Sequence, residues 1–199
     1  MSRVIASITT SVDGYVTGPD DRPGQGLGRG GERLHHWVMG GPWTYDGGHD
    51  FGMHGPDKEF HDDLVSTMRS GIVGRGMYDA SGAWGGRNPF PGTLFVLTHR
   101  TAEQPPADSG FQFVDDLDEA LALATEDAAG GDVAIGGGAD VIRQALAAGR
   151  VDELVISTAP VLLGAGKRLF EGFDHDVDLE VVSVVSSPYA IHVRYRVQR

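Results

Sequence analysis

The chain has 199 residues, with 28 acidic and 16 basic side chains, a formal net charge of −12 and no cysteine. The missing cysteine excludes a disulfide framework, a thiolate nucleophile and any iron–sulfur or Cys-ligated zinc site in these residues. The acidic charge, with no basic stripe along the sequence, argues against nucleic acid as a partner.

The first segment of the chain predicts a buried strand over residues 4–10. Its apolar run is too short for a signal peptide, and no stretch approaches the ~20 apolar residues that cross a bilayer. We therefore expect a cytoplasmic protein without a membrane partner. The turn that follows, at Asp13 and Gly14, is either an ordinary tight turn or a loop that contacts a ligand at the strand end.

Residues 19–56 hold four prolines, four histidines and many of the 30 glycines, with no sustained hydrophobic period. This composition predicts a long Gly-rich loop insertion with one short helix. Trp37, Trp43 and Tyr45 favour an ordered loop, because aromatic rings gain free energy by burial. No linker composition divides the chain, so residues 1–199 are predicted to form one domain.

A helix is predicted over residues 56–70, with proline in its first turn and Gly71 just past its end. Phe60, Leu64 and Met68 recur every four residues and form its apolar stripe. The acidic side chains near its start suit the positive end of a helix dipole.

Strands and helices alternate beyond this helix. The predicted strands start at residue 72 and cover residues 94–98, 111–114, 133–135 and 153–158, and the predicted helices cover residues 117–129 and 139–148. Asp115 or Asp116 is expected to cap the first of these two helices. Such alternation is typical of a parallel sheet with helices on its faces.

The C-terminal part predicts an antiparallel hairpin with arms at residues 178–186 and 189–198. In the second arm, Ile191 is predicted to face the core, while His192 and Arg194 face water at the sheet edge. The fold class is therefore expected to be α/β, with a mostly parallel central sheet flanked by helices and an antiparallel C-terminal hairpin.

Glycine-rich turns follow predicted strands at residues 74–76, 136–138 and 164–168. A strand, a glycine turn and a helix N-terminus together form a unit that binds phosphate through backbone N–H groups. The alternative is a tight turn that needs glycine for its backbone shape.

Thr98, His99 and Arg100 close another predicted strand. A hydroxyl, an imidazole and a guanidinium at the carboxyl end of a strand are groups that can hold the 2′-phosphate of NADPH. A solvated turn is the alternative reading of these three residues.

A further cluster of titratable residues lies in the Gly-rich loop: His35, His36, Asp46, His49, Asp50 and His54. Their spacing is not that of metal ligands on a formed helix or strand. We therefore expect surface side chains here and no metal.

Six segments of the chain match, in order, motifs of one known family. They are residues 10–15 (TSVDGY), 73–78 (VGRGMY), 96–100 (VLTHR), 137–146 (GGADVIRQAL), 149–154 (GRVDEL) and 160–170 (PVLLGAGKRLF). Together they resemble the dihydrofolate-reductase-like superfamily, and within it the reductase domain of the bifunctional riboflavin-biosynthesis deaminase–reductase and its stand-alone relatives. The deaminase half has no counterpart here, because its zinc signature contains cysteine.

The resemblance implies NADPH as cofactor, a homodimer and a small-molecule substrate. It places the cofactor against Ala6, Gly14, Gly74, Arg75, Gly76, Met77, Thr98, His99, Arg100, Gly136, Gly137, Gly138, Ala139 and Asp140. Within this set, the segment near Ala6 would line the nicotinamide, Thr98 and Arg100 would meet the 2′-phosphate, and residues 137–140 would hold the pyrophosphate. The family often carries Thr or Ser at the position of Met77, so one hydroxyl contact is missing here.

The candidate catalytic residues are acids. In dihydrofolate reductases the catalytic carboxylate lies on the helix before the Gly-Arg turn, and the corresponding helix here offers Asp57 and Glu59, followed by Asp62 and Asp63. Asp13, beside the first strand, is the other candidate proton donor or polar contact. The alternative for the helix acids is a solvated helix start.

The function expected from this resemblance is hydride transfer from NADPH to the ribose of a 5-amino-6-(5-phosphoribosylamino)uracil. Two alternatives stay open at this point. One is a reductase of the same fold that acts on a dihydrofolate, a pterin or another small molecule. The other is a nucleotide-binding sensor without turnover.

Overall fold

The computed structural model describes residues 2–47 and 51–198, and its main feature is a sheet of eight strands. The described strands, of which β2 and β8 lie outside this sheet, are β1 (Val4–Ser11), β2 (Tyr15–Thr17), β3 (Met68–Gly74), β4 (Leu94–Leu97), β5 (Phe111–Val114), β6 (Asp132–Ile135), β7 (Glu153–Ala159), β8 (Lys167–Arg168), β9 (Leu179–Ser186) and β10 (Ile191–Val197). The helices are α1 (His36–Met39), α2 (Gly55–Val65), α3 (Arg75–Ala80), α4 (Leu117–Asp127) and α5 (Ala139–Ala147), with 3₁₀ turns η1 (Gly31–His35), η2 (Tyr45–Gly47) and η3 (Gly82–Gly86).

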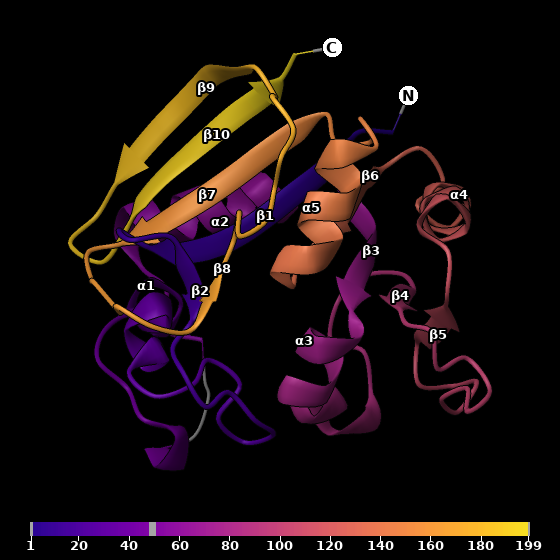
Figure 1. Ribbon diagram of the computed structural model, residues 1–199, viewed down its shortest axis with the longest axis horizontal. Coiled ribbons are helices and arrows are strands. Elements are labelled where there is room, and N and C mark those ends of the chain that lie inside the picture. The colour runs from indigo at the N-terminus through magenta and orange to yellow at the C-terminus, as the bar shows by residue number, and fades with distance from the viewer. Residues whose placement is uncertain (1, 48–50, 199) are drawn as a thin grey trace.

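The strand order across the sheet is β5-β4-β3-β6-β1-β7-β10-β9 (Figure 1). The strands from β5 to β7 in this order run parallel, and β10 and β9 are antiparallel to their neighbours. The expected α/β class with an antiparallel C-terminal hairpin is confirmed. The short strands β2 and β8 pair with each other beyond the end of β1.

Strand β6 lies between β3 and β1, although it follows both in the chain. The chain therefore reverses its direction across the sheet at this point. In open α/β sheets ligands bind at such a reversal, outside the carboxyl ends of the strands. The carboxyl ends of β4, β3, β6, β1 and β7 all reach this edge, because these strands are parallel.

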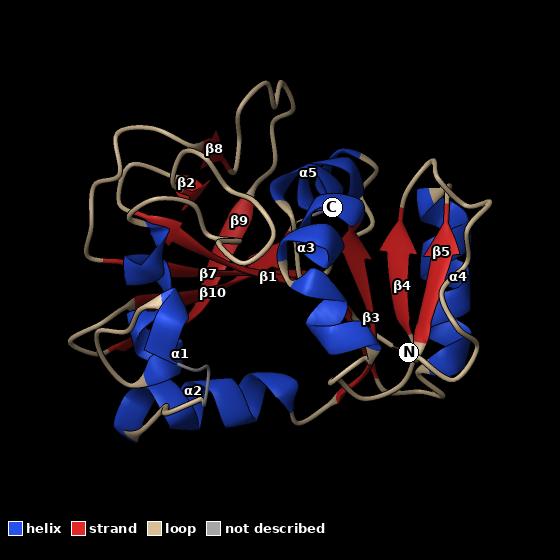
Figure 2. Cartoon of the chain, turned by 90° about the horizontal axis from the view of Figure 1, so that it is seen from below, coloured by secondary structure: helices blue, strands red, loops and turns tan. Residues whose placement is uncertain are grey.

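Helices cover both faces of the twisted sheet: α4 and α5 pack on one face, and α2 and α3 on the other (Figure 2). The alternation of side chains along the strands explains this arrangement. In β3, Ile72 packs with the α4 and α5 side, whereas its neighbour Val73 packs with Met77 and Tyr78 of α3. Apolar side chains on both faces are typical of a parallel sheet buried between helices.

The helix predicted over residues 56–70 ends earlier, at Val65, and Met68 begins β3 instead. The physical reason is Thr67, whose backbone oxygen accepts from the Asp132 amide at 2.8 Å and whose hydroxyl donates to the Asp132 carboxylate at 2.6 Å. These bonds attach the chain to β6 and stop the helix. Met68 still packs in the same core cluster as Phe60, so the four-residue spacing of apolar side chains continues past the end of the helix.

The prediction for the second hairpin arm was wrong. Ile191 is half exposed, whereas His192 is fully buried and Arg194 is mostly covered. The reason is that α2 covers this face and supplies acidic partners: Asp57 bonds to His192, and Asp63 bonds to Arg194. Strand β10 is also not at the sheet edge, because β9 lies outside it.

Strand β3 begins four residues before its predicted start at residue 72, and, apart from the end of α2, the boundaries of the other predicted strands and helices lie within two residues of the predicted ones. Asp116 is the cap of α4, since its carboxylate accepts from the Glu119 amide at 2.8 Å. The loop insertion over residues 19–56 carries more helical structure than the single helix expected, namely η1, α1 and η2. Leu34 and Trp37 bury its central part against the rest of the molecule.

Candidate functional site

Two of the predicted glycine turns lie in contact at the reversal point of the sheet. The Gly74 amide, at the end of β3, donates to the Gly137 oxygen, after β6, at 2.7 Å. A methyl group on Gly137 would lie 3.4 Å from the sulfur of Met77 and 3.5 Å from Ile8, so the turn is tightly enclosed on that side. The Gly136 amide donates a hydrogen bond to the Ile72 oxygen at 3.0 Å. The N-termini of α3 and α5 are therefore neighbours.

Gly76 and Gly138 differ from the other glycines whose surroundings are described. Each of the others has a positive φ or a neighbouring atom within 4 Å of where a Cβ would stand. Gly76 and Gly138 have neither. Glycine costs roughly 0.5–1 kcal/mol inside a helix relative to alanine, and at a helix N-cap Ser, Thr, Asp and Asn bond to the backbone where glycine has no side chain to do so. Neither a positive φ nor a contact with a more distant residue requires glycine at these two places, and the missing side chain leaves the backbone open to close approach of a ligand.

The first turn of α5 has no side-chain cap. Gly138 is its N-cap and makes no side-chain bond to the helix. Ala139 follows and is buried, and Asp140 is exposed, with its carboxylate held by Gln144 at 2.7 Å and Arg143 at 3.3 Å. Uncapped N–H groups together with the helix dipole favour an anion at this end.

Two arginines meet beside this helix end, through one carboxylate. Arg75 Nε donates to Asp79 Oδ1 at 2.7 Å, and Arg100 Nη2 lies 3.4 Å from Asp79 Oδ2. The guanidinium of Arg75 also stacks on the ring of Phe113, 4.9 Å from its centre. The predicted phosphate residues from the turns after β3 and β4 are thus brought together.

Thr98 and His99 complete the turn after β4. The Thr98 side chain is buried, and its hydroxyl accepts from the Arg100 amide at 3.1 Å, which fixes the turn. His99 is exposed. A hydroxyl already bonded to its own turn can still accept or donate a second bond, whereas the exposed imidazole is free to turn toward a ligand.

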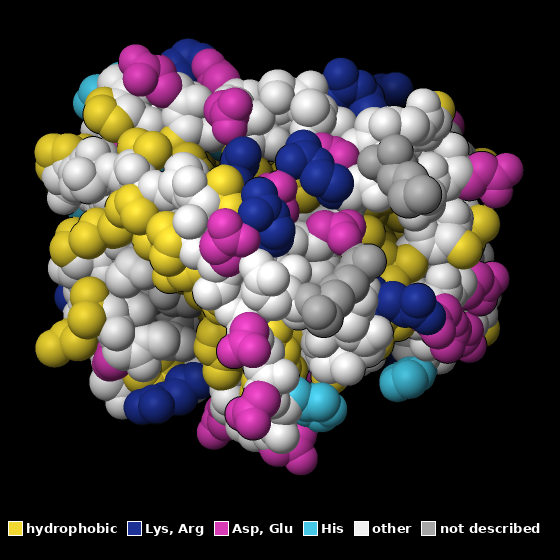
Figure 3. Space-filling model, turned by 90° about the horizontal axis from the view of Figure 1, so that it is seen from above, with side chains coloured by type: hydrophobic (Ala, Val, Ile, Leu, Met, Phe, Trp, Pro, Cys, Tyr) yellow, Lys and Arg dark blue, Asp and Glu magenta, His cyan; other side chains and the backbone are white. Residues whose placement is uncertain are grey.

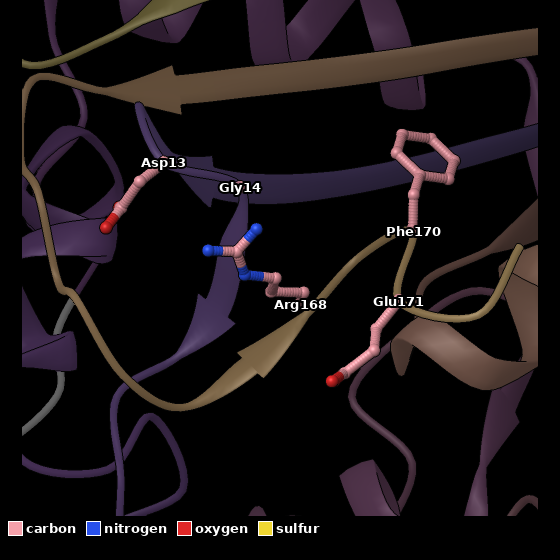
Figure 4. A pocket seen from close by; sticks show the side chains of 5 residues that line it. All are labelled: Asp13, Gly14, Arg168, Phe170 and Glu171. Carbon is pink, nitrogen blue, oxygen red and sulfur yellow. The ribbon is translucent and has the colours of Figure 1, made fainter.

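A cavity of about 370 Å³ opens beyond the end of β1 and is lined by Asp13, Gly14, Arg168, Phe170 and Glu171 (Figure 4). Leu169, between two lining residues, donates its amide to the Gly14 oxygen at 2.9 Å. The wall is further held from α5, where Arg143 donates to the Leu169 oxygen at 3.0 Å. The guanidinium of Arg168 lies 4.8 Å from the centre of the Tyr15 ring. The cavity lining therefore holds one guanidinium, that of Arg168, together with the carboxylates of Asp13 and Glu171.

Asp13 bonds to the neighbouring loop as an ionised group. Its carboxylate accepts from the Ser11 hydroxyl at 2.6 Å and from the amides of Leu163 and Gly164 at 3.1 and 2.8 Å. These hydrogen bonds, the one from Ser11 foremost, lower the pKa of Asp13 to about 2. A group with this pKa carries no proton near neutral pH, so its geometry fits a loop anchor better than a proton donor.

A buried polar chain that the sequence pattern did not indicate lies between α2, β7 and β10. His192 Nε2 lies 2.9 Å from Asp57 Oδ1, and its Nδ1 lies 2.8 Å from the Ser157 hydroxyl. The imidazole stacks on Phe60 at 4.1 Å between ring centres and meets the edge of Trp37 at 4.9 Å. Burial lowers the pKa of His192, and the bond to Asp57 opposes that shift.

Two other predicted site residues, Glu59 and Ala6, take no part in this buried group of polar side chains. Glu59, two residues after Asp57, is on the exposed face of α2. Ala6 is fully buried in the core, so its side chain has no surface open to a ligand. Asp57 and Glu59 both lie on α2, but only Asp57 bonds to His192, which is far away in the sequence. The local sequence therefore gives no signal that distinguishes the two acids.

No group of three or more side chains suited to a metal ion occurs among residues 2–47 and 51–198. Within the loop insertion, His36 packs its ring against Tyr189, and His54 bonds to the Gly52 oxygen at 3.1 Å. His49 and Asp50 lie outside the described residues. No helix in the described part of the chain has the length and apolar character that a membrane span requires.

The surface mixes acidic and basic side chains, and in the face seen from above the blue and magenta groups alternate (Figure 3). Ion pairs between exposed side chains, for example Arg150 with Asp118, bring opposite charges together on the surface. An anionic ligand therefore meets a local arrangement of amides and arginines rather than the net charge of the molecule.

Comparisons with known proteins bear on the family and the fold of the chain. Residues 2–193 match the family model described as RibD C-terminal domain. A structure of a riboflavin biosynthesis protein from Shewanella sp. PV-4 has a TM-score of 0.71 at 21% identity, with 100% of both chains covered. A dihydrofolate reductase from Enterococcus faecalis, complexed with NADP(H), has a TM-score of 0.64 at 21% identity, with 99% of this chain and 97% of that chain covered.

A bifunctional deaminase and 5-amino-6-(5-phosphoribosylamino)uracil reductase from Thermotoga maritima has a TM-score of 0.63 at 14% identity. The match covers 99% of this chain and 57% of that enzyme. These likenesses show a dihydrofolate-reductase-like fold. No curated protein matches the chain.

Proposed function

The chain belongs to the RibD C-terminal domain family, and on this premise we propose that it is an NADPH-dependent reductase acting on a small, polar substrate. The substrate class that we favour is a ribosylamino-pyrimidine. A 5-amino-6-(5-phosphoribosylamino)uracil is the substrate named for the reductase from Thermotoga maritima. The resemblance of the six sequence segments supports the same class.

The observation that carries the proposal is the pair Gly76 and Gly138. They stand at the starts of two neighbouring helices, and at neither place does a positive φ or an atom of a more distant residue within 4 Å exclude a side chain. A dinucleotide pyrophosphate needs close access to backbone N–H groups at a helix N-terminus, and a side chain would obstruct that access.

The residues present fit the coenzyme. Backbone amides of residues 138–140 would hold the pyrophosphate, and Arg75 and Arg100 would meet the 2′-phosphate, with Thr98 beside them. Planar guanidinium groups bind phosphate with two parallel hydrogen bonds. When bound, the reduced nicotinamide supplies a hydride, and the protein supplies position and a proton.

Asp57 is our choice for the group that delivers this proton. Its carboxylate is buried and bonded to the imidazole of His192, which in turn contacts Ser157. Reduction of a carbonyl or imine needs a proton on the heteroatom as the hydride reaches carbon. Of the three acids predicted from the sequence, Asp13 is held as an ionised anchor and Glu59 is exposed.

Arg168 is our choice for a contact to an anionic part of the substrate. It lines the cavity at the end of β1, and its guanidinium rests on the Tyr15 ring. A cation that is already placed on an aromatic face loses little freedom when it binds a phosphate. Arg168 is the one cation among the lining residues, beside the carboxylates of Asp13 and Glu171, and a phosphorylated ribose would meet it there.

The test of the proposal is coenzyme binding by isothermal titration calorimetry. We expect wild-type protein to bind NADPH more tightly than NADH, and Arg100→Ala to weaken NADPH by roughly tenfold or more with little change for NADH, because one charge-assisted phosphate contact is lost. Arg150→Ala is the matched control, since Arg150 is also an exposed arginine paired with an aspartate. Equal losses for both coenzymes in Arg100→Ala would remove the 2′-phosphate assignment.

A substrate screen at fixed NADPH then separates the remaining activities. Substrate-dependent loss of the near-ultraviolet absorbance of NADPH with a ribosylamino-pyrimidine supports the proposed class. Turnover of dihydrofolate, with inhibition by methotrexate, would assign a pterin reductase instead. Coenzyme binding with no turnover of any substrate in the screen would favour a sensor and contradict the proposed activity.

We also propose that the protein forms a homodimer through β9. This strand is one of the two outer strands of the sheet, and its residues Leu179, Val181, Val182 and Val184 are exposed. Figure 3 shows apolar side chains gathered on the side of the molecule where β9 and β10 lie in Figure 1. A second copy is the natural occupant, because two such edges can pair about a two-fold axis with the same residues on both sides.

A further inference from the structure

Asp79, on α3, joins the two arginines that the proposed function assigns to the 2′-phosphate. Its two carboxylate oxygens are divided between them, with Oδ1 on Arg75 and Oδ2 on Arg100. A carboxylate is an anion that accepts the same hydrogen bonds from guanidinium groups as a phosphate does. Asp79 therefore stands where an anionic ligand of the two arginines would compete with it.

The two arginines depend on Asp79 to different degrees. Arg75 has further support, because its guanidinium lies over the rings of Phe113 and Tyr78. The Arg100 side chain is 70% exposed, and its contact with Asp79 is long, at 3.4 Å. An exposed ion pair of this kind contributes little stability, so Arg100 can leave Asp79 at small cost.

The charge balance of the site is the second observation. Two guanidinium groups and one carboxylate leave a local charge of one positive unit, and the Asp79 side chain is 40% exposed. A phosphate that binds the two arginines must replace the carboxylate on at least one of them and then lies beside a negative group. Repulsion between like charges a few ångströms apart weakens that binding.

We propose that Asp79 sets how strongly the protein prefers NADPH over NADH. It occupies Arg75 and Arg100 when the coenzyme is absent and yields Arg100 to the 2′-phosphate when NADPH binds. The carboxylate lowers the affinity for the phosphorylated coenzyme and leaves the affinity for NADH unchanged. This inference rests on the proposed function and adds to it a specificity-determining residue.

Calorimetric titrations of wild type and Asp79→Asn with NADPH, with NADH and with adenosine 2′,5′-bisphosphate test the proposal. We expect Asp79→Asn to bind NADPH and the bisphosphate roughly threefold to tenfold more tightly, with less than a twofold change for NADH. The gain is expected to shrink as salt is added. Asparagine keeps the size of the side chain, and Asp118→Asn is the matched control, since it breaks another arginine pair on α4, which packs on the opposite sheet face.

A double variant shows whether the effect passes through Arg100. In the Arg100→Ala background, Asp79→Asn is expected to lose most of its gain in NADPH affinity. Weaker NADPH binding by Asp79→Asn would mean that the carboxylate positions the arginines for the phosphate, which overturns the proposal. An unchanged NADPH-to-NADH ratio in a protein that binds NADPH overturns this inference alone, whereas a wild type that binds neither coenzyme overturns the proposed function as well.

Discussion

His192 is a fully buried imidazole with polar partners at both ring nitrogens. Burial disfavours the charged ring and lowers the pKa of His192, although the carboxylate of Asp57 favours the charge. His35, in the loop insertion, is shifted in the same direction, and burial lowers its pKa from 6.5 to about 4. Both imidazoles are therefore neutral in the native state at pH values where the unfolded chain binds a proton.

The sign of the resulting pH effect follows from this difference. Below the unfolded pKa of 6.5 the unfolded chain takes up protons that the native protein does not, so the free energy of unfolding falls as pH falls, down to about 4 for His35. We expect urea unfolding to give lower stability at about pH 5 than at about pH 7.5. His192→Gln, which keeps a polar side chain without titrating in this range, is expected to flatten the dependence. An unaltered slope in that variant would show that His192 contributes nothing to it.

Residue-level prediction found groups that lie together in the structure, and their role toward a coenzyme stays a prediction. Arg75, Arg100 and the glycine turns were indicated by their positions after strands, and the structure brings them together. It failed for His192, which was predicted to face water. The alternation of β10 correctly divides its side chains into two faces, but only tertiary structure reveals that α2 covers the polar face and provides Asp57.

At the scale of elements, the second residue of the short helix α3 is Gly76, which has no positive φ and no neighbouring atom within 4 Å of where a Cβ would stand. We expect Gly76→Ala to raise the free energy of unfolding by about 0.5–1 kcal/mol, because alanine loses less backbone freedom in a helix. The same variant is expected to weaken NADPH several-fold, since the new methyl group limits approach to the backbone. Stability from urea unfolding and affinity from calorimetry measure the two effects.

Gly130→Ala provides the contrast for this variant. Gly130 has open space around it, but its φ is +93°, a backbone shape that alanine rarely adopts. It follows α4, on the other face of the sheet from α3. We expect lower stability and unchanged coenzyme affinity there. A loss of stability in Gly76→Ala, or unchanged NADPH binding, would contradict the role given to Gly76.

Most elements were predictable because each has local signals. The boundaries of β5 matched, and those of α4 and α5 differed only at their ends. The end of α2 could not be predicted, because the bonds of Thr67 to Asp132 join residues 65 positions apart. Contacts of that range fix where a helix stops but leave no trace in its own periodicity.

At the scale of the whole molecule, β9 exposes apolar side chains along an outer edge. We expect wild-type protein to sediment as a dimer, more completely at higher salt, because salt screens the repulsion between two chains of net charge −12. Val184→Lys is expected to give monomers, since Val184 is 59% exposed on β9 and a charge there opposes burial. Val65→Lys, at the exposed end of α2, is the control. A wild-type monomer, or a Val184→Lys dimer, would contradict the proposed interface.

The sheet order was not predictable from periodicity or spacing. These patterns indicated a parallel sheet and a terminal hairpin, but they do not specify which strands are neighbours. The contact between Gly74 and Gly137, on which the site depends, exists because β6 enters between β3 and β1. The family resemblance anticipated a shared role for these turns, and the single-domain assignment of residues 1–199 stays a prediction.

The position of β6 inside the sheet also affects how the chain folds during its synthesis. β1 leaves the ribosome first, yet its two neighbours are β6, which begins at Asp132, and β7, which begins at Glu153. While only the first 131 residues have been synthesised, β3, β4 and β5 can pair, but both sides of β1 stay without a strand. We therefore expect a nascent chain that has not yet reached β6 to carry β1 without its neighbouring strands, which is the stage at which chaperones matter most for it.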